Sequence, residues 1–105
     1  MEQPNSEYIN QLSGDNEKFK ARIIGILKRE LPEEVEVYHQ HIKTENYKLA
    51  AESVHKLKHK VSILGLEKSY YIAEEYEDNL KENSTCLQSD FEDILERMQD
   101  FVDKL

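Results

Sequence analysis

The segment 55–66, His-Lys-Leu-Lys-His-Lys-Val-Ser-Ile-Leu-Gly-Leu, combines a possible nucleophile with cations at helical spacing. The apolar residues around it recur with the period of one buried helix face: Val54, Leu57, Val61 and Leu64. His55 falls outside this stripe, so its imidazole should face solvent, with Lys58 one turn further along on the exposed side. An exposed neutral imidazole can attack phosphorus, and a lysine ammonium can offset the charge of phosphoryl oxygens. The pattern therefore indicates a place that could hold a phosphoryl group.

The same segment resembles the signature of histidine phosphotransfer (HPt) domains of multistep phosphorelays. That signature runs His-x-x-Lys-Gly, then small residues, then Leu-Gly-[Ala/Leu]. The matching positions are His55, Lys58, Leu64, Gly65 and Leu66. Two positions depart from it, because His59 stands where the family usually has glycine and Lys60 where it usually has a small residue. The likeness covers residues 8–82 clearly and the final helix by pattern only.

The resemblance implies a role for four residues. His55 would be the phosphoacceptor, and Lys58 would stabilise the charge of the phosphoryl group. Glu77, on the helix after Gly65, corresponds to the polar family residue that bonds the non-reacting ring nitrogen and orients the ring. His59, where the chain departs from the family pattern, would modulate access to the site or share the anion.

The resemblance also implies a function and partners. The protein would accept a phosphoryl group from a receiver-domain aspartate and pass it to another, as a phosphocarrier without turnover of its own. Its partners would be response-regulator receiver domains and a hybrid sensor histidine kinase. It would need no cofactor or metal of its own, because the receiver brings Mg²⁺ and the acidic pocket.

Other interpretations stay open on the sequence. The protein could be a phosphorylation-dead HPt-like adaptor that binds receiver or kinase domains, which the His59 substitution would favour, or a plain helical interaction module. His59 could also act as a second acceptor. His55 and His59 have the spacing of half a zinc site, but His39 and His41 point to different faces of another helix and no cysteine assists.

Charge and composition limit the partners and the compartment. The net charge of −8 argues against a nucleic acid, whose phosphates demand a basic surface. The exception is 43–60, where five lysines outnumber two glutamates. These lysines either solvate an exposed face or attract an anion, such as a phosphoryl group or an acidic partner pocket. A partner would then also contact exposed apolar residues of the leading helix, for which Ile9 and Leu12 are the candidates.

No apolar run approaches the roughly 18 residues of a membrane span, and the N-terminus does not resemble a signal peptide. The single cysteine, Cys86, cannot form an internal disulfide and fits a reducing compartment. We therefore expect a cytoplasmic monomer without membrane contact.

Helical periodicity runs through the whole chain. Expected helices cover about 6–12, 16–42 as one helix kinked near Leu31, 47–64, 66–80 and 87–105. Two separate helices, the second restarting after Pro32, stay open for the segment 16–42. Ser13 or Asp15, Asn46, and Thr85 with Gln88 are the expected N-terminal caps, and Phe19 is expected in a core stripe. Short connections favour a single all-α domain over 1–105, an up-and-down antiparallel four-helix bundle with a short extra N-terminal helix.

Overall fold

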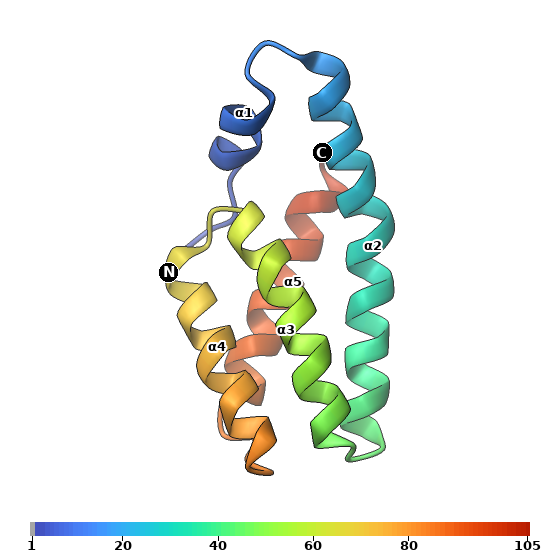
Figure 1. Ribbon diagram of the computed structural model, residues 1–105, viewed down its shortest axis with the longest axis vertical. Coiled ribbons are helices and arrows are strands. Elements are labelled where there is room, and N and C mark those ends of the chain that lie inside the picture. The colour runs from blue at the N-terminus through green and yellow to red at the C-terminus, as the bar shows by residue number, and fades with distance from the viewer. Residues whose placement is uncertain (1) are drawn as a thin grey trace.

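The computed structural model describes residues 2–105, and within them every regular element is an α-helix. The helices are α1 (Glu7–Ser13), α2 (Glu17–Lys43), α3 (Tyr47–Ile63), α4 (Glu67–Lys81) and α5 (Gln88–Asp103). The prediction of an all-α protein with a short leading helix is confirmed. Figure 1 shows the chain running down α2, up α3, down α4 and up α5. No helix in the described part of the chain is both long and apolar enough to cross a membrane.

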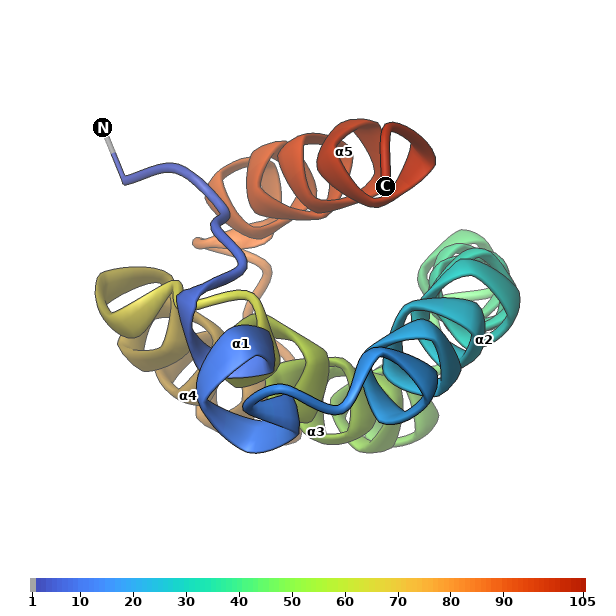
Figure 2. The same ribbon diagram turned by 90° about the horizontal axis from the view of Figure 1, so that it is seen from above.

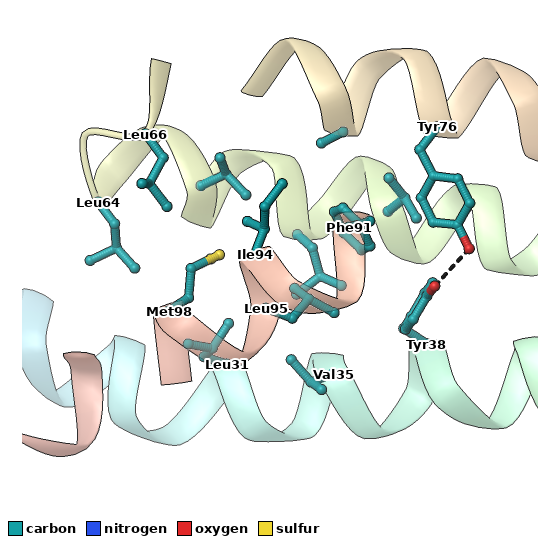
Figure 3. Close-up of a cluster of buried hydrophobic side chains, with 14 of the residues drawn as sticks. Leu31, Val35, Tyr38, Leu64, Leu66, Tyr76, Phe91, Ile94, Leu95 and Met98 are labelled. Atoms are coloured by element: carbon teal, nitrogen blue, oxygen red, sulfur yellow. Dashed lines mark hydrogen bonds between the residues drawn. The ribbon is translucent and has the colours of Figure 1, made fainter. Parts of the chain in front are cut away.

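The four long helices surround one apolar core. Each of them packs against two others, in the order α2, α3, α4, α5 and back to α2, and Figure 2 shows this arrangement along the long axis. The fully or almost fully buried core side chains include Leu31, Val35, Leu57, Leu64, Phe91, Ile94 and Met98. Several of them meet in Figure 3, which shows α5 contributing from one side and α2 from another. The core thus fixes how α3 and α4 lie against each other.

The long helix α2 passes through Pro32 without ending, as the in-phase apolar stripe predicted. Leu31 and Val35 on either side of the proline are buried, so packing compensates for the backbone hydrogen bond that proline cannot make. Phe19 in the first turn is a correction. It is 41% exposed rather than part of the core, because the first turns of α2 lie near one end of the molecule.

The helix caps were only partly predicted. Asn46 caps α3 as expected, its side chain accepting from the Leu49 amide at 3.3 Å. Asn16, and not Ser13 or Asp15, caps α2 by accepting from the Phe19 amide at 3.0 Å. The expected cap at Thr85 is also wrong, since α5 begins with no side-chain cap.

Residues 2–5, which we call the N-terminal strap, lie across the turn between α3 and α4. The Asn5 amide donates to the Leu64 carbonyl at 2.9 Å. The Glu2 carboxylate accepts from the backbone amides of Lys68 and Ser69 at 2.9 Å each, and so caps α4. Gly65 has φ +74°, and an added Cβ would lie 2.6 Å from Oδ1 of Asn5. The turn therefore requires glycine for its backbone conformation, and the Asn5 side chain fills the space that a side chain at this position would occupy.

A buried polar group links three helices beside the core. The hydroxyls of Tyr38 on α2 and Tyr76 on α4 lie 2.7 Å apart, and the Tyr38 hydroxyl donates to Glu92 of α5 at 3.0 Å. Figure 3 shows the two tyrosines pointing toward each other. Burial raises the pKa of Tyr76 to about 12 and that of Tyr38 further still, so both stay protonated and can donate.

Candidate functional site

His55 lies near the middle of α3, with its side chain directed away from the core. Val54 and Leu57 on either side of it in sequence are fully buried, which turns the His55 position outward. Its side chain is 56% exposed. The predicted exposure of His55 is therefore confirmed, and a large partner can reach the ring.

Glu77 of α4 holds one nitrogen of that ring. Its two carboxylate oxygens lie 3.3 and 3.2 Å from Nδ1 of His55. A carboxylate only accepts hydrogen bonds, so Nδ1 must be the donor and carry a proton. In the neutral imidazole this leaves Nε2 with a free electron pair. Of the four acids between 74 and 78, packing of α4 on α3 brings Glu77 to the ring.

Lys58 is where the structure departs most from expectation. The residue was expected on the exposed face, but only 8% of its surface is accessible. Its Nζ lies 3.2 Å from Oε1 of Glu77 and 5.5 Å from the centre of the Tyr70 ring. The long lysine side chain follows the apolar surface between α3 and α4 and places its charge beneath Glu77.

A second cation completes the surroundings of Glu77. Lys81, one turn further along α4, places Nζ 3.3 Å from Oε2 of Glu77 while 58% of its side chain remains exposed. Sequence reasoning did not single out Lys81. The only available signal was its position four residues after Glu77, which is common in surface helices.

These contacts decide the charge states in the site. Burial by itself would raise the pKa of Glu77, but hydrogen bonds from Lys58 and His55 outweigh it and hold that pKa below 4.5. Burial would likewise lower the pKa of Lys58, and the contact with Glu77 reverses this and raises it. Glu77 is therefore a carboxylate and Lys58 an ammonium at neutral pH. Lys58 and Lys81 thus place two positive charges beside the one buried carboxylate of Glu77.

The positive segment 43–60 is partly neutralised by the fold. Besides Lys58, Lys60 is also buried, with Nζ 3.0 Å from Glu30 and 3.3 Å from Glu34 of α2. Lys48 and Lys56 remain exposed, and both line an open hollow with His55. The exposed positive charge near the imidazole thus comes from Lys48, Lys56 and Lys81.

His59 lies one turn beyond His55 on the same face, as predicted. The two rings meet edge to face, with centroids 5.4 Å apart, and His59 is exposed. It occupies space that glycine would leave open. Within residues 2–105, no three His, Cys, Asp or Glu side chains gather closely enough to hold a metal ion.

The leading helix α1 differs from expectation at one position. Ile9, expected on the surface, is completely buried and belongs to the core. α1 is only seven residues long, and Ile9 is the apolar side chain that packs it against the core of the bundle. Leu12 is 48% exposed, as expected, and Tyr8 is exposed as well.

Fold and site together define a small helical domain that presents an exposed, carboxylate-oriented histidine on one helix face. A family model described as the Hpt domain matches residues 22–105, and the chain belongs to that family. Hpt domains are phosphocarriers of two-component phosphorelays, where they work with receiver domains and kinases. Neither a comparison with curated proteins nor one with solved structures found a match. The strap, α1 and the first turn of α2 lie outside the matched residues.

Proposed function

We propose that this protein accepts a phosphoryl group on His55 from a receiver-domain aspartate and passes it to a second receiver. The observation that carries the proposal is the pairing of Nδ1 of His55 with the buried carboxylate of Glu77, at 3.2 and 3.3 Å. This pairing leaves Nε2 as the nucleophile on an exposed ring. Without such a partner the proton would not be held on Nδ1, and Nε2 would not be kept free to attack.

In the proposed reaction, the electron pair of Nε2 attacks the phosphorus of an aspartyl phosphate. The new P–N bond forms as the P–O bond to the aspartate breaks, and that oxygen leaves as a carboxylate with the bonding pair. The proton on Nδ1 stays there, hydrogen-bonded to Glu77, which stabilises the positive charge that the ring gains. The receiver supplies Mg²⁺ to neutralise the phosphoryl oxygens. The reverse sequence passes the group on.

Lys58 and His59 have separate parts in the proposal. From its place beneath Glu77, Lys58 contributes positive charge to the phosphorylated state and holds the orienting carboxylate in position. His59 narrows the approach to Nε2 from the C-terminal side of α3. We infer an up-and-down antiparallel bundle of α2–α5 as the rigid support for this geometry, and a cytoplasmic monomer as the working form.

The test is phosphorylation of defined variants. Incubation with a phosphorylated receiver domain should label the protein with a bond that is labile in acid and stable in alkali. His55→Gln should abolish the label, and His59→Gln should retain it. Label that persists in His55→Gln and disappears in His59→Gln would assign the wrong histidine. Binding of the receiver without any label would make the protein an adaptor instead.

A further inference from the structure

Two hollows with different chemistry flank His55 on the face shared by α3 and α4. The first lies toward the start of α3, and Lys48, Lys56 and Lys81 line it together with Glu52 and Glu77. Lys81 reaches this hollow because the last turn of α4 lies beside the first turns of α3 in the antiparallel pair. The net charge of these five residues is positive, whereas the whole protein carries −8.

The second hollow lies toward the end of α3. Its walls are His59 and Ser62 of α3, Leu66, and Glu67, Tyr70 and Tyr71 at the start of α4. Tyr71 has 69% of its surface accessible, more than any other exposed large hydrophobic residue in 2–105. Its ring contacts only Tyr70 among the aromatic residues, with centroids 5.8 Å apart. The Tyr71 ring can leave water only when a partner protein covers it.

We propose that the receiver docks on this α3/α4 face, with Tyr71 as its apolar anchor and Lys48, Lys56 and Lys81 as the complement of its acidic pocket. This inference rests on the proposed function and specifies its partner surface. It places the apolar anchor on α4 rather than on α1, where Ile9 is buried and Leu12 is less exposed than Tyr71.

The size of a transient interface supports this placement. A contact of about 500 Å² per partner, centred on His55, reaches about 12 Å in every direction along the surface. Seven residues of helix rise about 10 Å. Lys48 and Ser62, each seven residues from His55, therefore fall inside any such contact, and both hollows are covered when a partner reaches Nε2.

Charge complementarity indicates which kind of partner protein binds this face. A receiver's phosphorylation site is an acidic, metal-binding pocket, and three exposed lysines beside the acceptor match it. These lysines together with the exposed Tyr71 ring make a contact that speeds encounter with the receiver by charge. The contact is also weak enough for the receiver to dissociate after transfer. The charge contribution acts on the rate of association and falls with salt.

The experiment compares two phosphoryl donors. A purified receiver domain, chosen from a panel as the fastest donor, tests docking, whereas phosphoramidate is too small to dock and reports on His55 alone. With phosphoramidate, the P–N bond of the donor breaks, ammonia leaves, and the P–N bond to His55 forms. Tyr71→Ala should lower kcat/KM for the receiver about tenfold, and Lys48→Glu/Lys56→Glu should lower it and reduce its dependence on salt. Tyr71→Ala should be labelled by phosphoramidate as the unmodified protein is. The lysine variant should lose more with the receiver than with phosphoramidate, because only the receiver docks on the wider surface.

Matched controls lie elsewhere on the surface. Tyr8→Ala removes an exposed aromatic ring from α1, and Lys104→Glu reverses a charge after α5; neither should change transfer from the receiver. If Tyr71→Ala transfers normally while Tyr8→Ala or Leu12→Ala is impaired, docking is on α1 and this inference is wrong. If His55 is labelled by neither donor, the proposed function itself fails, and the docking surface with it.

Discussion

At the scale of single residues, Glu77 organises the site. It is buried, it accepts from His55, Lys58 and Lys81, and its pKa is held below its ordinary value by those contacts. A buried carboxylate needs compensating donors, because desolvation of an unpaired charge is costly. Lys58 and Lys81 compensate the buried charge of Glu77. They also hold its carboxylate in the position from which it orients the imidazole of His55. Stability and orientation of the acceptor are therefore coupled at this position.

The coupling predicts the behaviour of Lys58→Ala. Because Lys58 is buried against Glu77, its removal should lower the free energy of unfolding by about 1–3 kcal/mol. A lysine on the exposed face, where the sequence placed Lys58, would have little effect on stability. Urea unfolding measures the change, and Lys56→Ala, an exposed neighbour, is the control and should lie within about 0.5 kcal/mol of the unmodified protein. Equal stabilities of the two variants would show that Lys58 is exposed in solution.

At the scale of elements, the turn between α3 and α4 sets the register of the site. The helix that carries His55 ends with Leu64 as its C-cap residue, and Leu66 stands at the N-cap position of the helix that carries Glu77 without a side-chain hydrogen bond. The strap adds to this turn a hydrogen bond from Asn5 and a carboxylate cap from Glu2. The strap lies outside the residues that match the family model.

The strap leads to a prediction with a definite pH dependence. Partial burial would raise the pKa of Glu2, but the amides of Lys68 and Ser69 outweigh it and lower that pKa below 4.5. A lowered folded-state pKa means that Glu2 stabilises the protein above about pH 4.5 and loses its effect as the pH falls through the folded value. Glu2→Ala should therefore cost about 1 kcal/mol at pH 7, and the difference should shrink in acid.

Thermal unfolding at pH 7 and pH 3 measures that difference. Glu75→Ala, an exposed acid within α4, serves as the control and should have little effect at either pH. A cost of Glu2→Ala that is the same at both values would mean that the carboxylate does not cap α4.

At the scale of the whole molecule, the polar group of Tyr38, Tyr76 and Glu92 ties α2, α4 and α5 together beside the apolar core. A core of aliphatic side chains tolerates small shifts of one helix along another, whereas hydrogen bonds have a fixed geometry. This group therefore contributes to holding the bundle in one arrangement, including the placement of α4 that brings Glu77 to His55.

The hydroxyls of the two tyrosines should contribute as a unit. Tyr38→Phe leaves the Tyr76 hydroxyl and Glu92 without that partner in a buried setting and should cost about 1–3 kcal/mol. Adding Tyr76→Phe removes the orphaned hydroxyl as well, so the double variant should cost clearly less than the sum of the single ones. Chemical unfolding of all three variants measures the coupling. Additive effects would indicate that the two hydroxyls do not bond in solution.

The sequence by itself determined the helices and the outward position of His55. Both depend on the 3.6-residue period of apolar side chains, which is local and survives any arrangement of the bundle. The same period correctly predicted that α2 continues through Pro32. The sequence was less informative at the helix ends. Ser13, Asp15 and Asn16 can each accept a hydrogen bond from the first amides of α2, and sequence alone did not identify Asn16 as the cap.

Tertiary structure decided what surrounds His55. A lysine side chain is long enough to turn toward solvent or toward a neighbouring helix, so Lys58 has no fixed direction until α4 offers a carboxylate. Among the acids at 74, 75, 77 and 78, only the rotation of α4 against α3 brings Glu77 to Nδ1. The contact of Lys81 with Glu77 is local to α4, but packing places the end of α4 beside the start of α3 and so brings Lys81 into the hollow beside His55. The contacts of His55 and Lys58 with Glu77 join two different helices, and their geometry is set by the packing of the core.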